Sequence, residues 1–207
     1  MKKIFFTSIL LLSILIDKSA QAQYGYVPNG FFAFAWDINV PLNNKDFIER
    51  TSFYGGKIEG RTFITPKFSV GGELSWNSSY QYQPKRTYQF DGGAVTTDLY
   101  KYVYNVPFNL NAHYYFMDDK LIMPFAGLGV GAMYSEQDVY FNIYNLNSNN
   151  WGFLLRPEAG ALIKFGSNST TAALLGVRYN YATNRESDFN INKIKSLSFQ
   201  VGIAFMQ

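Results

Sequence analysis

The sequence predicts an all-β protein, an eight-stranded antiparallel transmembrane β-barrel, and three observations support this fold class. Stretches of about ten residues alternate between apolar and polar side chains, which is the period of a β-strand. The chain is rich in Tyr (16) and Phe (19) but only 16% charged, and aromatic residues favour strands. The connections between these stretches alternate between short and long, as in barrels whose turns and loops lie on opposite sides of a membrane.

Composition excludes several kinds of site. A chain of 207 residues suits one barrel domain. The absence of cysteine excludes disulfides and thiolate metal sites, and a single histidine excludes a multi-histidine metal centre. We therefore expect no metal and no cofactor.

The first 22 residues predict a cleaved signal peptide. A basic start, Met1-Lys2-Lys3, precedes an apolar run over residues 4–16 and the small-residue site Ala20-Gln21-Ala22. The alternative is a membrane anchor, but the run is short of the roughly 20 residues that span a bilayer as a helix. The barrel domain is then 23–207. Because Lys2, Lys3, Lys18 and Asp17 lie in the removed segment, the formal net charge falls from +3 to +1, and we expect no nucleic-acid partner.

Eight stretches alternate, and we predict one strand for each: 31–40, 53–64, 68–78, 99–116, 124–134, 151–165, 171–181 and 194–205. Tight turns are predicted at 65–67, 117–121 and 166–168, and long polar loops at 41–52, 79–98, 135–150 and 182–193. Two prolines within strands, Pro107 and Pro157, predict local bulges, because proline donates no hydrogen bond to the ladder.

The polar face of these strands predicts a charge network inside the barrel. Its charged members balance in sign: Asp37, Lys57, Glu59, Arg61, Glu73, Arg156, Glu158 and Arg178. Pairing about the tight turns sets Glu59 opposite Glu73, with Lys57 and Arg61 as diagonal neighbours, and sets Glu158 opposite Arg178. The other face is apolar throughout, and only lipid can cover such a band. A soluble lipid-binding barrel, the weaker alternative, has the reverse arrangement.

Aromatic residues near the strand ends predict two membrane-interface girdles. Those expected at the long-loop rim are Trp76, Tyr100, Tyr102, Tyr134 and Tyr179, and those at the short-turn rim are Phe68, Tyr114, Phe165 and Phe205. The alternative is that aromatic residues merely favour strands, but this does not explain their clustering at strand ends.

Two segments resemble a known family. Pro124-Phe125-Ala126-Gly127-Leu128-Gly129-Val130-Gly131 is similar to a glycine-rich fifth strand, and Phe199-Gln200-Val201-Gly202-Ile203-Ala204-Phe205 is similar to a carboxy-terminal assembly signal. Both resemble the small outer-membrane β-barrel superfamily, in particular the eight-stranded transmembrane domain of outer membrane protein A. The resemblance implies the outer membrane of a Gram-negative bacterium, outer-membrane lipids as partners, and insertion by the barrel-assembly machinery. The family usually ends on the aromatic residue, whereas Met206 and Gln207 follow here.

Catalysis is the remaining alternative. Some barrels of this size are lipid A deacylases that use a histidine and a serine, and His113 is the candidate base. It lies at the short-turn end on the inner face, away from lipid A, and we interpret it as a lumen residue. Glu59 and Glu73 are likewise interpreted as structural charges rather than a hydrolytic pair. We therefore predict no catalytic residue, no wide pore, and a structural or surface-interaction role in which the outer loops can bind a ligand.

Overall fold

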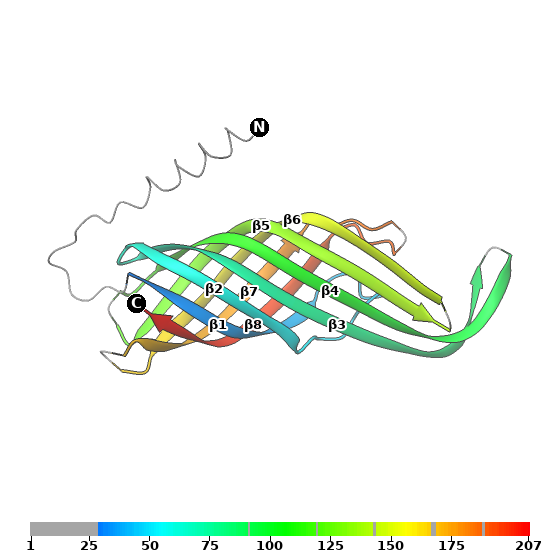
Figure 1. The fold of residues 1–207 in the computed structure, drawn as a ribbon, viewed down its shortest axis with the longest axis horizontal. Helices are drawn as coiled ribbons and strands as arrows, with labels where there is room; N and C mark the ends of the chain where they lie inside the picture. Colours follow the sequence, from blue (N-terminus) through cyan, green and yellow to red (C-terminus); the bar gives the residue numbers. More distant parts are fainter. Residues whose placement is uncertain (1–28, 91, 119, 143, 167–168, 188) are drawn as a thin grey trace, which may run out of the picture.

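Eight antiparallel strands form one closed barrel in the computed structural model, which describes residues 29–207 except 91, 119, 143, 167–168 and 188. Each strand pairs with its neighbours in the chain, and β8 closes the barrel on β1 (Figure 1). The strands are β1 (Gly30–Pro41), β2 (Tyr54–Thr65), β3 (Phe68–Phe90), β4 (Gly93–Tyr115), β5 (Ile122–Phe141), β6 (Tyr144–Lys164), β7 (Thr171–Ala182) and β8 (Ile194–Met206). The predicted fold class is confirmed. The predicted signal peptide lies outside the described residues.

The register shows that the strands are staggered around the barrel. A path around the barrel can be followed from each residue to its registered partner on the next strand. It starts at Ala33 on β1 and ends at Ile194 on β8, and the partners between them are Glu59, Glu73, Asn109, Gly131, Leu154 and Ala182. Because Pro41 pairs with Ser196, Ile194 is level with Asn43, ten residues beyond Ala33. Such a stagger requires tilted strands, and eight of them leave an interior just wide enough for side chains to fill.

Two of the predicted loops are largely strand, and this part of the sequence prediction was wrong. The β3–β4 ladder continues outward to Phe90 and Gly93, and the β5–β6 ladder continues to Phe141 and Tyr144. Figure 1 shows the β3–β4 hairpin projecting from one end of the barrel. The projecting parts of these hairpins are largely polar on both faces because they lie beyond the apolar wall, and this polarity suggested loops. Val139 in the lid is an apolar exception on the inner face. The long connections that remain are 42–53 and 183–193; we call their end the long-loop end and the opposite end the short-turn end.

The predicted bulges at the two prolines are also absent. Register shifts occur at Phe63/Thr65 and Gln83/Arg86 instead. Pro107 and Pro157 keep their registered partners on β5, Met133 and Leu128. On the other side of each proline, toward β3 and β7, the pairing is interrupted but resumes in the same register, so no residue is inserted.

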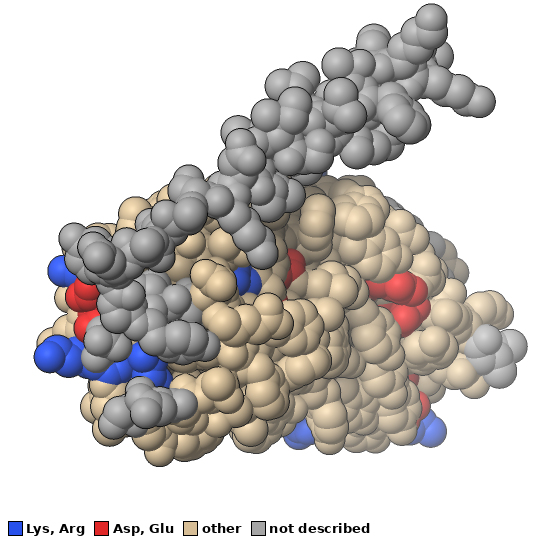
Figure 2. Space-filling model, turned by 60° about the vertical axis from the view of Figure 1, so that its left-hand side comes forward, with Lys and Arg blue, Asp and Glu red and all other residues tan. Residues whose placement is uncertain are grey.

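The outer surface of the wall is apolar on every strand. Exposed examples, one from each strand in order, are Phe34, Ile64, Leu74, Leu110, Val130, Leu155, Leu175 and Ile203. Figure 2 shows that Lys, Arg, Asp and Glu occupy only small areas of the visible side. No helix in the described part of the chain is long and apolar enough to cross a membrane.

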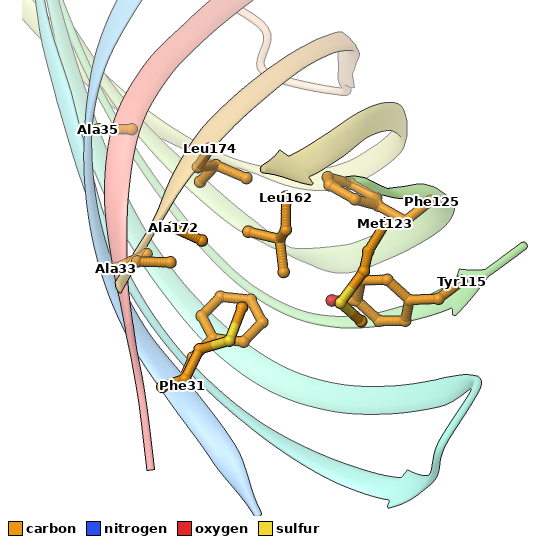
Figure 3. Close-up of a cluster of buried hydrophobic side chains, with 11 residues drawn as sticks. Phe31, Ala33, Ala35, Tyr115, Met123, Phe125, Leu162, Ala172 and Leu174 are labelled. Carbon is orange, nitrogen blue, oxygen red and sulfur yellow. The ribbon is translucent and has the colours of Figure 1, made fainter. Parts of the chain in front are cut away.

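The short-turn end of the lumen is closed by an apolar plug, which the sequence analysis did not predict. Its buried members extend inward from six strands: Phe31, Ala33, Ala35, Tyr115, Met123, Phe125, Leu162, Ala172, Leu174, Ala204 and Met206. Figure 3 shows the labelled side chains converging across the barrel. Leu162 is fully buried and Leu174 nearly so. Lys164, two residues further toward the short-turn end on β6, is a buried charged residue on the same inner face.

The long-loop end is closed by two connections that pack together. Phe47 and Ile48 from 42–53 and Ile191 from 183–193 form a buried cluster with Val103 and Val139 on the inner face of β4 and β5. We call this cluster the lid. The Nδ2 groups of Asn43 and Asn44 each donate to the carbonyl of Lys193 at 2.8 Å, which ties one connection to the other.

Candidate functional site

Two arginines and two carboxylates meet across the lumen. Nη1 of Arg156 on β6 donates to Oε1 of Glu73 on β3 at 2.6 Å, and Nη1 of Arg178 on β7 donates to the same oxygen. Arg178 also donates from Nη2 to Oδ2 of Asp37 on β1 at 2.9 Å. All four side chains are buried. Charge-assisted hydrogen bonds of this kind are about twice as strong as neutral ones, and here they join strands on different sides of the barrel.

A second group of charges extends from β2. Nζ of Lys57 lies 3.2 Å from Oε2 of Glu59 and 4.0 Å from Oε2 of Glu73, and Nη1 of Arg61 lies 3.6 Å from Oε2 of Glu59. Glu59 and Glu73 are register partners, as the turn at 65–67 predicts. Lys57 therefore compensates two carboxylates that would otherwise repel each other.

The predicted pairing of Glu158 with Arg178 is wrong in one respect. They are register partners, but the Glu158 carboxylate accepts a hydrogen bond from Nε2 of His113, and the ion pairs of Arg178 are with Asp37 and Glu73. The Arg178 side chain is long enough to cross the narrow lumen to Asp37 and Glu73. Sequence register cannot reveal contacts between strands that are far apart in the ladder.

His113 lies at the boundary between the charge network and the plug. It is buried, and its ring stacks on Phe125 with ring centroids 4.3 Å apart. Its register partner is Ser69, but that hydroxyl accepts from Nε of Arg61 at 3.1 Å and donates to the hydroxyl of Tyr115 at 3.5 Å. Neither of these hydrogen bonds activates the serine as a nucleophile, because activation requires a base within hydrogen-bond reach.

Amide and hydroxyl groups continue the network toward the long-loop end, and the sequence analysis assigned them no contacts. Nε of Arg156 donates to Oδ1 of Asn180 at 2.6 Å. Asn180 and Asn39 each donate from Nδ2 to the hydroxyls of Ser196 and Ser198, at 2.8–3.0 Å. In the sequence, the only feature that could have predicted these contacts was that all four residues occupy inward-facing positions of their strands. The polar filling thus reaches from His113 to the outer rim.

A small cavity lies between this polar filling and the lid. Its volume is about 50 Å³, and its lining includes Asn39, Asn105, Gln137, Phe47 and Ile191. This is enough space for a few water molecules, since a polar cavity of roughly 10–15 Å³ already holds one. Nζ of Lys101 lies over the ring of Phe47, one of the lining residues, and donates to the carbonyl of Asp46 at 3.0 Å. Burial and the nearby Arg86 lower the pKa of Lys101.

The predicted girdle residues all lie on the outer surface, but not all in one row. Trp76, Tyr134 and Tyr179 lie near the long-loop rim, where the Tyr134 ring contacts Trp151 at 5.4 Å. Tyr100 and Tyr102 lie further out, on the projecting part of β4. At the short-turn rim, Phe68 pairs with Tyr114, while Phe165 and Phe205 are exposed at the ends of their strands.

The described residues contain no group of three or more His, Asp or Glu side chains arranged to hold a metal ion. Carboxylates and cations pair in the middle of the lumen, between the plug at one end and the lid at the other. These ion pairs and hydrogen bonds across the lumen stabilise the barrel wall from the inside.

No protein-family profile and no curated protein sequence matches the chain. Solved structures do match it. Neisserial surface protein A has 14% identity and a TM-score of 0.50, with 86% of this chain and 96% of that chain covered. The outer membrane protease OmpT from Escherichia coli has 7% identity and a TM-score of 0.51, with 89% and 99% covered. At these identities the likeness concerns the fold alone. This chain has the closed antiparallel barrel fold of the small outer-membrane β-barrels.

Proposed function

We propose that this chain is an integral outer-membrane β-barrel with a structural or surface-interaction role, without a wide pore and without catalytic activity. The observation that supports this most directly is the apolar outer wall around a charged interior. Phe108 and Leu110 are 57% and 66% exposed on the middle of β4, whereas the neighbouring inward residues Asn109 and Asn111 are buried. A soluble protein rarely exposes so continuous an apolar surface to water, whereas in a membrane the lipid chains cover such a surface.

The orientation follows from the two ends of the barrel. Membrane barrels have short turns on the periplasmic side and larger segments outside, so we assign the short-turn end to the periplasm. The projecting hairpins and the lid then face outward, where they can meet a surface ligand. We also propose that β8 is the segment that the barrel-assembly machinery engages during insertion.

Cysteine labelling on intact cells tests location and orientation together, because the natural chain contains no cysteine. Ser187→Cys, exposed in the connection 183–193, should react with a membrane-impermeant maleimide on intact cells. Lys120→Cys, exposed in the connection between β4 and β5, should react only after the outer membrane is opened. Reversed labelling would overturn the orientation, and recovery of the protein in the soluble periplasmic fraction would overturn the membrane assignment.

Closure of the lumen predicts the absence of porin-like conductance. Arg156 and Arg178 cross the interior, and the plug and the lid lie on either side of them. Purified protein in planar bilayers should therefore show no steady conductance, or only small, brief openings. A steady conductance of porin size from a verified monomer would contradict the closed interior and would favour a transport role.

The absence of catalysis rests on the surroundings of His113. Its Nε2 group is hydrogen-bonded to the Glu158 carboxylate, and its ring stacks on Phe125 deep inside the barrel. A lipid substrate has no path to that position through the plug. Lipase or deacylase activity that disappears in a His113→Ala variant would contradict this part of the proposal and favour a lipid-modifying enzyme.

A further inference from the structure

The outer face of the projecting sheet has an ordered surface that the closed barrel does not require. Two successive rows across β4, β5 and β6 each contain a tyrosine, a carboxylate and an amide: Tyr104, Glu136 and Asn149, then Tyr102, Asp138 and Asn147. Gln137 and Val139 point inward, to the cavity and to the lid, so the alternating residues on β5 point outward. We call these six residues the patch.

The two tyrosines of this patch form a platform together with the neighbouring Tyr140 on β5. Tyr102 stacks against Tyr104 with centroids 6.3 Å apart and meets Tyr140 edge-on at 5.9 Å. Tyr104 and Tyr140 are about two-fifths exposed. A platform of tyrosine rings offers apolar faces on which the C–H faces of a sugar ring can pack, with hydroxyl groups at its margin.

The carboxylates and one amide provide fixed hydrogen-bonding groups beside the platform. Nδ2 of Asn147 donates to Oδ1 of Asp138 at 2.7 Å and to Oε1 of Glu136 at 3.0 Å. The Tyr134 hydroxyl donates to Oε2 of Glu136 at 3.1 Å. Asp138 is only 8% exposed, although it lies on the outer face. Carboxylate oxygens accept hydrogen bonds from hydroxyl groups, and amides both donate and accept.

The charge of the patch selects the class of ligand. Neither Glu136 nor Asp138 forms an ion pair with any described residue, and the six patch residues include no Lys or Arg. Like charges close together are unfavourable, so a phosphorylated or sulfated ligand would be repelled. A neutral polyhydroxyl group is compatible with both the carboxylates and the aromatic platform.

The position of the patch indicates where such a group comes from. The row directly below it, Val106, Tyr134 and Trp151, belongs to the aromatic rim of the apolar wall. The patch thus lies on the lipid-facing side of the barrel, immediately above the apolar belt, rather than on the tips of the hairpins. We propose that it binds the uncharged sugar headgroups of glycolipids in the membrane that surrounds the barrel. This inference rests on the membrane insertion proposed above.

The three tryptophans allow a test with an internal control. Trp151 lies beside the patch, on β6, and Trp36 lies on β1, on the far side of the barrel. Trp36→Phe with Trp76→Phe leaves Trp151 as the reporter, and Trp76→Phe with Trp151→Phe leaves Trp36. Each full-length protein is reconstituted in phosphatidylcholine vesicles that contain a small fraction of one lipid with dibrominated acyl chains, which quench nearby tryptophan fluorescence. Three vesicle preparations are compared, in which the brominated lipid is digalactosyldiacylglycerol, phosphatidylcholine or phosphatidylglycerol.

We expect dibrominated digalactosyldiacylglycerol to be enriched about fivefold over phosphatidylcholine near Trp151 and not near Trp36. Tyr102→Ala or Asn147→Ala should abolish the enrichment. Tyr114→Ala, on the outer face of the same strand at the short-turn end, should leave it unchanged. Equal quenching of Trp151 by all three lipids would overturn the inference, as would preference for phosphatidylglycerol.

Two further outcomes separate the possible failures. If none of the brominated lipids quenches Trp36 or Trp151, membrane insertion itself has failed, and the proposed function is wrong. If free digalactose displaces the glycolipid at low concentration, the patch binds soluble sugar equally well, and the assignment to membrane glycolipid is wrong.

Discussion

Replacing Glu73 with alanine is expected to destabilise the barrel by about 3–5 kcal/mol, the usual cost of removing one partner from a buried ion pair. Glu73 accepts hydrogen bonds from Arg156 and Arg178 and lies 4.0 Å from Nζ of Lys57. Its loss leaves these cations buried with too few acceptors. The free energy of unfolding of the purified protein in phosphatidylcholine vesicles, measured by urea titration, gives the effect directly.

The matched control is Asp118→Ala. Asp118 pairs with Lys67 at 3.6 Å, but both side chains are more than two-fifths exposed, and exposed pairs contribute about 0–1 kcal/mol. A double-mutant cycle then identifies the partner. Glu73→Ala with Arg178→Ala should recover part of the loss, with a coupling of about 0.5–3 kcal/mol. Glu158→Ala with Arg178→Ala should couple less, because the Glu158 carboxylate is hydrogen-bonded to His113 rather than to Arg178. A larger coupling for Glu158 than for Glu73 would contradict the observed contacts of Arg178.

Leu162→Ala in the apolar plug is expected to cost about 2–5 kcal/mol, because the substitution removes buried methyl groups and leaves a cavity that the surrounding side chains fill only in part. Leu162 is fully buried in the lumen among Phe125, Leu174 and other plug residues. The same urea titration measures the loss.

Leu128→Ala is the comparison on the opposite face of the wall, where the side chain is 49% exposed. Both substitutions remove the same atoms, but mobile lipid chains refill the space at Leu128, so only the transfer contribution is lost. Leu162→Ala should therefore be the more destabilising of the two. Equal losses would mean that the plug is loosely packed and would weaken its assignment as the closure of the short-turn end.

Glycines in the fifth strand have a role in packing that the sequence suggests only in outline. A Cβ on Gly131 would lie 2.1 Å from the Phe108 carbonyl oxygen, and one on Gly127 would lie 2.1 Å from the His113 ring. A Cβ on Gly72 would have its nearest neighbour at 3.8 Å. The glycine-rich segment at 124–131 thus allows β4 and its ring-bearing side chains to approach β5 closely, whereas Gly72 is not required for space.

The local pattern of apolar and polar residues was sufficient to predict the number and order of the strands and which side chains face the lipid or the lumen. In a barrel wall one face contacts lipid and the other the lumen, so period-two alternation assigns each residue to a face. The short connection between β2 and β3 then determines the register of these two strands, which is why the Glu59–Glu73 pairing was predictable. Alternation fails where both faces have the same polarity. The projecting hairpins are largely polar on both sides, and strand ends such as Met123 and Leu162 are apolar on the inner side.

Only the tertiary structure decided what meets across the lumen. The ion pairs of Arg178 with Asp37 and Glu73 join β7 to β1 and β3, and the lid joins two connections more than a hundred residues apart in the sequence. These contacts depend on the stagger with which the barrel closes, and this stagger is the sum of all the strand registers rather than a property of any one segment. The sequence by itself therefore determined the wall of this protein, and barrel closure determined its interior.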